Sequence, residues 1–277
     1  MERRASDRRG GLAKGLGWVL VALLATAACG TLSVTEEEEL GADAARSLRR
    51  ELDFVRDERV RTYVEEIGAR IVAAAGSQPY DFRFHVVNDE SLNAFALPAG
   101  HIYIHTGIIL ESADVSELAG VIAHEIGHVT ERHVARNYRR QRNTGIFYQL
   151  AAIAASIFVG GQAAAGGQLL GELAAVAFVN TFTREAEDEA DAFAVEVLPR
   201  AGYDPHGLVS FFETLEAQGS ANVPEFLSSH PTTENRIERT RALLVEADLP
   251  EGLITRDDGK LQIVQRRIEL LQRSRRR

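Results

Sequence analysis

Three residues of the segment from His124 to His128 have the types and the spacing needed to hold a metal ion and activate water. They form an HExxH motif, with histidines at both ends and Glu125 after the first one. The surrounding stretch, residues 114–136, is predicted to be a helix, and residues four apart on a helix share a face. His124 and His128 can therefore offer two imidazoles to one zinc ion. Glu125 beside them suits hydrolysis, in which the glutamate takes a proton from a water that the metal activates.

A catalytic zinc site needs a third protein ligand. The only cysteine is Cys29, so sites with two or more cysteine ligands are excluded. The pattern HExxHxxGxxH is also excluded, because its last histidine position is Val134. His133 lies one residue before that position and would point about 140° around the helix from His128. We therefore expect His133 to be a surface or packing residue.

A later acidic helix offers the missing ligand. The segment from Thr183 to Asp191 opens a helix whose apolar stripe includes Ala190 and Ala194. Glu187 lies on the same face as that stripe, and Asp191 lies four residues further on. A buried carboxylate needs a partner, so Glu187 is the candidate third ligand and Asp191 the candidate acceptor for a ligand histidine. The alternative is an acidic helix start that only complements the helix dipole. The remaining acidic residues of this segment are expected to face solvent: Glu185, Asp188 and Glu189.

The N-terminus has the layout of a secretory signal. Residues 3–14 are basic, and residues 16–28 form an apolar run that is too short for a confident membrane span. Cys29 follows directly, as in bacterial lipoproteins, where this cysteine carries the lipid. The alternative is an ordinary signal peptide with an incidental cysteine. Gly30 after the cysteine resembles the pattern that directs lipoproteins to the outer membrane.

Helices and a small sheet are expected around the motif. Apolar residues from Leu48 to Ala75 recur at helical spacing and predict one or two amphipathic helices. Residues 82–86 and 93–107 alternate as strands, with a bend at Pro98, and predict a small antiparallel sheet. An edge strand beside a protease cleft can bind an extended peptide, although the hairpin can also serve only as scaffold.

Two further segments leave alternatives open. Residues 145–171 carry no charge, and we interpret them as a lid or buried hairpin, with membrane insertion as the alternative. Residues 233–245 predict a helix whose three arginines are mostly solvated: Arg236, Arg239 and Arg241. The basic tail at residues 273–277 could meet anionic lipid or be disordered.

Five motifs, in order, resemble the zinc metallopeptidases related to HtpX, the Oma-type protease and the CAAX prenyl endopeptidase. The resemblance covers roughly Leu40 to Leu244. The motifs are NAFALP from Asn93, HEIGHVTERH from His124, TREAEDEAD from Thr183, RAGYDP from Arg200, and SHP from Ser229 with Arg236-Ile237.

The resemblance implies an α+β, mainly α-helical, zincin-like fold with a small antiparallel sheet. It implies His124, His128 and Glu187 as ligands of one Zn²⁺ per chain and Glu125 as general base. It also implies that His230 and Asn93 line the cleft. His230 would either stabilise the oxyanion or occupy the open zinc position in a latent state.

The expected organisation has four parts. They are a lipoprotein signal peptide (1–28), a lipidated tether (29–45), a zinc metallopeptidase domain (46–248) and a C-terminal extension with a basic tail (249–277).

The function predicted from these features is a zinc endopeptidase of the bacterial cell envelope. It would be anchored by lipid at Cys29, face the periplasm from the outer membrane and cleave misfolded or misassembled envelope proteins. The runner-up is an assembly chaperone for envelope proteins with a latent protease site. A membrane-embedded prenyl-type protease would need several clear spans, which are missing. The net charge of −9 argues against nucleic acid as a partner. The oligomeric state is not predicted.

Overall fold

The computed structural model describes residues 32–137, 182–217, 226, 230 and 235–275. Every helix and strand named below belongs to one structural unit, Val34–Arg277. Cys29 and residues 145–171 lie outside the described residues. None of the helices in the described part is both long and apolar enough to cross a membrane.

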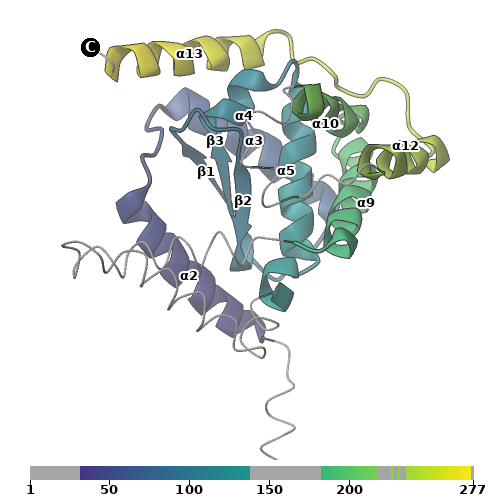
Figure 1. Ribbon diagram of the computed structural model, residues 1–277, viewed down its shortest axis with the longest axis horizontal. Coiled ribbons are helices and arrows are strands. Elements are labelled where there is room, and N and C mark those ends of the chain that lie inside the picture. The colour runs from purple at the N-terminus through teal and green to yellow at the C-terminus, as the bar shows by residue number, and fades with distance from the viewer. Residues whose placement is uncertain (1–31, 138–181, 218–225, 227–229, 231–234, 276–277) are drawn as a thin grey trace, which may run out of the picture. The chain divides into compact units, whose positions relative to one another are not determined.

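Helix α5 (Val115–Thr130) carries the HExxH motif and runs through the middle of the fold (Figure 1). All of its residues from Val115 to Val129 are buried. Its first turn is capped by Asp114, whose carboxylate accepts hydrogen bonds from the N–H groups of Ser116 and Glu117. Glu117 in turn accepts from the N–H of Ala113 at 2.8 Å. This reciprocal cap confirms the predicted helix start.

The sheet has three strands in the order β1-β3-β2, formed by β1 (Arg83–Val87), β2 (Ala94–Leu97) and β3 (His101–His105). Strands β2 and β3 pair antiparallel across the short 3-10 turn η1 (Pro98–Gly100), as predicted. Strands β1 and β3 pair in parallel, so the expectation of a purely antiparallel sheet was wrong. The reason lies in residues 88–93, which reverse the chain but do not form a tight hairpin. They leave β1 and β2 one strand apart, and β3 fills the gap.

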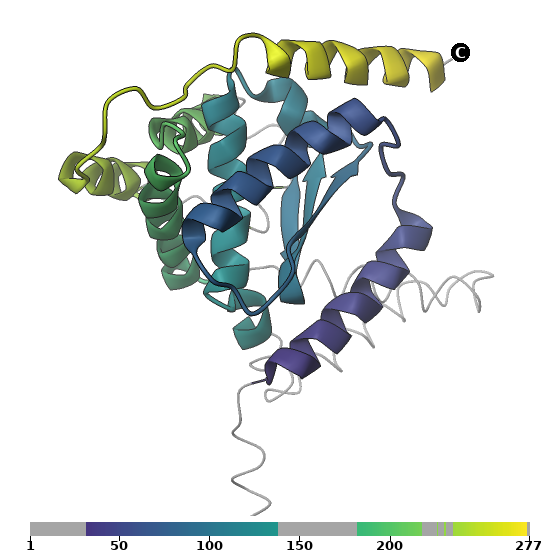
Figure 2. The same ribbon diagram turned by 180° about the vertical axis from the view of Figure 1, so that it is seen from behind.

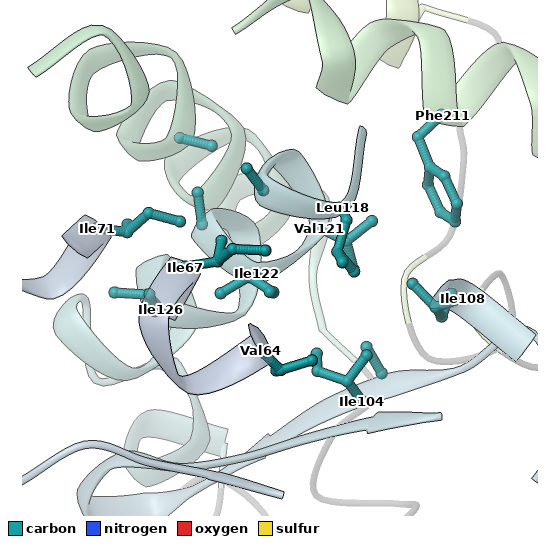
Figure 3. Packing of buried hydrophobic residues seen from close by; sticks show 14 of the residues in the cluster. Val64, Ile67, Ile71, Ile104, Ile108, Leu118, Val121, Ile122, Ile126 and Phe211 are labelled. Atoms are coloured by element: carbon teal, nitrogen blue, oxygen red, sulfur yellow. The ribbon is translucent and has the colours of Figure 1, made fainter. Parts of the chain in front are cut away.

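The sheet has a helix on each face. Alternate strand residues, such as Ile102 and Ile104, join the main core with α3 (Glu58–Ala75) and α5. Tyr103 faces the other way and packs with Leu48 of α2 (Val34–Glu51). Figure 3 shows the main core, in which side chains from α3, β3 and α5 meet. The predicted amphipathic segment therefore forms two helices on opposite faces of the sheet.

The other helices surround α5 and the sheet. Helices α9 (Arg184–Arg200) and α10 (His206–Ala217) pack on α5, and α12 (Arg236–Glu246) packs on both of them. Helix α13 (Lys260–Arg275) lies across α3 and the short helix α4 (Thr106–Glu111), as Figure 2 shows from behind.

Two glycines allow the close packing on α5. A Cβ atom at Gly120 would lie 2.8 Å from the Cα of Leu208 in α10. One at Gly127 would lie 3.1 Å from the Cα of Ala190 in α9. Glycine costs a helix up to about 1 kcal/mol relative to alanine, and the close approach of two backbones accounts for that cost here.

Candidate metal centre

Four side chains from three parts of the chain converge at a buried point. They are His124 and His128 from α5, Glu187 from α9 and His230, which lies between α10 and α12. One donor atom from each lies within 4.8 Å of the other three. None of the four side chains is more than 2% exposed. The inward position that the sequence predicted for Glu187 is confirmed.

The distances fit a zinc site. The Nε2 atoms of His124 and His128 lie 3.0 Å apart. Glu187 Oε2 lies 3.5 Å from His124 Nε2, and Glu187 Oε1 lies 3.4 Å from His128 Nε2. Two imidazole nitrogens and a carboxylate are a donor set that tetrahedral zinc accepts, with the fourth position left for water or substrate.

The surroundings of Glu125, next to His124 in the motif, also fit a bound ion. Glu125 is fully buried, and neither of its oxygens has a hydrogen-bond partner among the described residues. His230 Nε2 lies 3.4 Å from Oε1. An unpaired buried carboxylate costs free energy, which water held at an adjacent metal would offset. The residues present therefore match what a hydrolytic zinc ion requires.

The surroundings shift the pKa values of Glu125 and Glu187 in opposite directions. Burial raises the pKa of Glu125, which suits a group that must accept a proton near neutral pH. Burial also acts to raise the pKa of Glu187, but the charges of His230 and Arg236 prevail and hold it well below its usual value. Glu187 is therefore ionised, as a metal ligand must be.

Asp191 contacts one of the candidate ligand histidines. Its Oδ1 lies 2.9 Å from Nδ1 of His124, which leaves the Nε2 atom to face the converging donors. Burial lowers the pKa of His124, but hydrogen bonds to Asp191 and Glu187 outweigh burial and raise the pKa to about 9. Metal binding at neutral pH must displace that proton. The carboxylate–histidine arrangement is the one expected from the spacing of Glu187 and Asp191.

Arg236 corrects the sequence-based expectation of a solvated arginine. Its side chain is 1% exposed and lies beneath the metal centre. Nε donates to Asp191 Oδ2 at 2.6 Å, and Nη2 donates to Asp191 Oδ1 at 2.7 Å. Nη1 lies 2.7 Å from Glu187 Oε2. Arg236 is four residues before the buried Thr240, and this shared helix face was the signal for its burial.

His133 is a buried packing residue outside the ligand cluster, as one of the two expected alternatives had it, but it does not point away from His128. It is 2% exposed, and its Nδ1 lies 2.8 Å from Nδ1 of the ligand His128. Its Nε2 lies 2.8 Å from Glu189, which was expected only to face solvent. The helical angle failed as a guide because α5 ends at Thr130 and Arg132 takes a left-handed φ of 57°. The turn brings His133 back beside His128.

His230 and Asn93 are the two residues that the resemblance assigned to the cleft. His230 stacks on Phe226 at 4.5 Å between ring centroids, and its Nδ1 lies 3.1 Å from Glu187 Oε1. Asn93 is 8% exposed directly before β2. Its Oδ1 is buried with no hydrogen-bond partner among the described residues.

The structure thus has the fold class and the donor set of an HExxH metallopeptidase whose third ligand is a glutamate from a later helix. The chain belongs to peptidase family M48, whose model matches residues 58–244. This confirms the resemblance seen in the motifs.

Two groups of relatives are similar to this chain. The beta-barrel assembly-enhancing protease of Escherichia coli (strain K12) is 33% identical over 225 residues, which are 79% of this chain and 46% of the relative. The mitochondrial metalloendopeptidase OMA1 of Schizosaccharomyces pombe is 29% identical over 197 residues, which are 70% of this chain and 55% of the relative. The chain therefore spans about half the length of these relatives.

Replacement of Arg236 tests its role in neutralising the site. Arg236→Met should lower the free energy of unfolding by about 3–5 kcal/mol, because two buried carboxylates lose their cation. Arg239 on the same helix pairs with Asp188 where both side chains are more than two-fifths exposed. Arg239→Met should therefore cost less than about 1 kcal/mol. Urea denaturation of both variants measures the difference, and equal costs would contradict the role given to Arg236.

Replacement of His133 tests its role in orienting His128. His133→Ala should weaken zinc binding by about 10–100-fold, the usual effect of losing a partner of a metal ligand. The control is His206→Ala, since the side chain of His206 is 62% exposed and contacts Asp204 rather than the site. Competition with a chromophoric chelator gives the affinities. An unchanged affinity in His133→Ala would show that the contact does not support the metal centre.

Proposed function

We propose that the protein is a zinc-dependent endopeptidase. The observation that carries the proposal is the meeting of His124, His128 and Glu187 beside the carboxylate of Glu125, which accepts no hydrogen bond from the described residues. A bound zinc ion would supply Lewis-acid chemistry, polarising the peptide carbonyl and lowering the pKa of water. Membership of peptidase family M48 supports the same activity.

The chain's own residues would carry the protons and hold the geometry. Glu125 takes a proton from the attacking water and delivers it to the leaving amine, a role that its raised pKa favours. His230, whose Nε2 lies 3.4 Å from Glu125 Oε1, would donate a hydrogen bond to the developing oxyanion. Asp191 and Arg236 keep His124 and Glu187 oriented throughout.

A second candidate function rests on His230 as well. Its Nδ1 lies 3.2 Å from His124 Nε2, so it is within reach of the position that water or substrate would take. A histidine in that position would hold the site latent, and the protein would then act mainly as an assembly chaperone that binds envelope proteins without cleaving them. Cleavage of an unfolded substrate by the purified protein separates the two functions.

The proposed substrates are misfolded or misassembled proteins of the bacterial envelope. The support is similarity to a relative named as a protease that enhances beta-barrel assembly. We also propose that lipid on Cys29 anchors the protein to the outer membrane, facing the periplasm. Cys29 is the only cysteine and follows the apolar run directly, a few residues before α2.

Two substitutions test the peptidase mechanism. Glu125→Gln should reduce casein cleavage at least ~100-fold, because the general base is lost, while zinc content stays near one per chain. Glu187→Ala should lose both cleavage and most of the zinc, since it removes a ligand. Metal analysis and a fluorescent casein assay give the two readouts. Full cleavage by Glu125→Gln would refute the mechanism, and normal zinc content in Glu187→Ala would remove Glu187 from the ligand set.

Radiolabelled palmitate tests the anchor. The wild-type protein, expressed in a bacterial host, should incorporate the label and partition with membranes. Cys29→Ser should incorporate none, because the thiol is the acylation site. Casein cleavage by purified Cys29→Ser should match the wild type, which serves as the control for folding. Equal labelling of both proteins would exclude Cys29 as the site.

A further inference from the structure

A second cavity lies away from the metal centre, between α2, α3 and the edge of β1. Its volume is about 1110 Å³. Strand β1 is at one edge of the sheet, whereas β2 is at the other, and α5 packs against β2 and β3. We call this cavity the β1 slot. It is therefore separated from the metal centre by the width of the sheet.

Part of the outer edge of strand β1 lines the slot, and its backbone groups pair with no other strand in the described part of the chain. The carbonyl of Val86 accepts a hydrogen bond from Val55 N–H at 2.9 Å, so the polar groups of Val86 point away from β3. Because backbone groups alternate along a strand, those of Phe84 point the same way. The only bridge on this side, among the described residues, joins Phe54 to Val87. The chain then turns into α3, and the edge beside Phe84 is left open to pairing.

The two walls of the slot differ in chemistry. Towards α2 lie Arg49, Arg83 and His85, and burial, followed by the charges of Arg49, Arg83 and Arg61, lowers the pKa of His85 to about 4. Towards α3 lie Ala69 and Val72, together with Arg61 and Glu65, which pair with each other. An added strand would therefore face cations on one side and, on the other, apolar surface beside one ion pair.

The positive charge of the slot is not neutralised from within. Two carboxylates, Asp53 and Glu65, line it, and both already have cationic partners, Arg275 and Arg61. Arg49, Arg56 and Arg83 have no carboxylate partner within 4.0 Å among the described residues. The chain as a whole has a net charge of −9, so this cationic region is a local reversal.

We propose that the β1 slot binds an extended segment of another protein in which acidic and apolar residues alternate. The segment would pair with the open edge of β1 as a fourth strand. Its acidic side chains would meet Arg49 and Arg83, and its apolar side chains would lie on the α3 wall. The alternation follows from the strand period of two and from the different walls. This proposal does not depend on the peptidase activity.

The test uses the full chain carrying Glu125→Gln, so that no peptide is cleaved. The probe is a fluorescein-labelled octapeptide of four Glu-Val repeats, and its binding is measured by fluorescence anisotropy. Binding should be at least ~10-fold weaker for the double variant Arg49→Glu, Arg83→Glu, because charge-assisted contacts become repulsive. The matched control is Arg266→Glu, an exposed arginine of α13 outside the slot, which should bind like the parent.

Two further peptides test the pairing. An octapeptide with four glutamates followed by four valines has the same charge but the wrong period, and it should bind at least ~10-fold more weakly. Every second peptide residue can be N-methylated at either the odd or the even positions. Only one of these two peptides should lose binding, since alternate N–H groups face β1. Zinc removal by chelator should leave binding unchanged.

Several results would overturn the proposal. They are no binding of the alternating peptide at millimolar concentration, equal binding of the two peptides, equal binding by the double variant, or release of peptide by the chelator. Vesicles of phosphatidylglycerol provide the remaining comparison. If vesicle binding requires Arg49 and Arg83 but peptide binding does not, the arginines bind a lipid surface and the strand-addition proposal fails.

Discussion

The metal centre depends on the neutralisation of buried charge. Glu187 and Asp191 are each 2% exposed, and buried carboxylates are tolerated only with partners. Arg236 contacts both of them, so one guanidinium links α12 to α9 directly beneath the ligand histidines. Its face is covered by the ring of Phe212 at 4.3 Å, which adds a cation–π contact from α10. The ligands of α5 and α9 are held in place because this cation holds the helices together.

The end of α5 is held by a second ion pair, in which the half-buried Arg132 contacts the buried Glu37 of α2. Glu37 of α2 is 2% exposed and accepts hydrogen bonds from Arg132 Nε at 2.7 Å and from the hydroxyl of Tyr80 at 2.6 Å. Arg132 is the residue whose left-handed backbone turns His133 towards His128. Helix α2 is thereby coupled to the orientation of His128. A few contacts therefore connect the first described helix with the metal centre.

Much of the site was accessible from sequence because helical periodicity is local. The spacing of His124 and His128, the inward face of Glu187 and the supporting position of Asp191 each follow from residues three or four apart on one helix. The helix cap at Asp114 and the bend at Pro98 are likewise local. The sheet was only partly predicted, because alternation identifies strands but does not say which strands pair. The parallel pairing of β1 with β3 depends on how residues 88–93 cross between the strands.

Sequence by itself determined the donor types, their spacing and the family of this protein, since these depend on residue identity and helical geometry. Only the tertiary structure decided that Arg236 is buried against Glu187 and Asp191, that His133 turns back onto His128, and that His230 lies within reach of the other donors. Each of these contacts joins residues from different elements or crosses a helix end, where a fixed angle per residue no longer applies. Their positions result from packing and from the pairing of buried charges, which a local pattern does not contain.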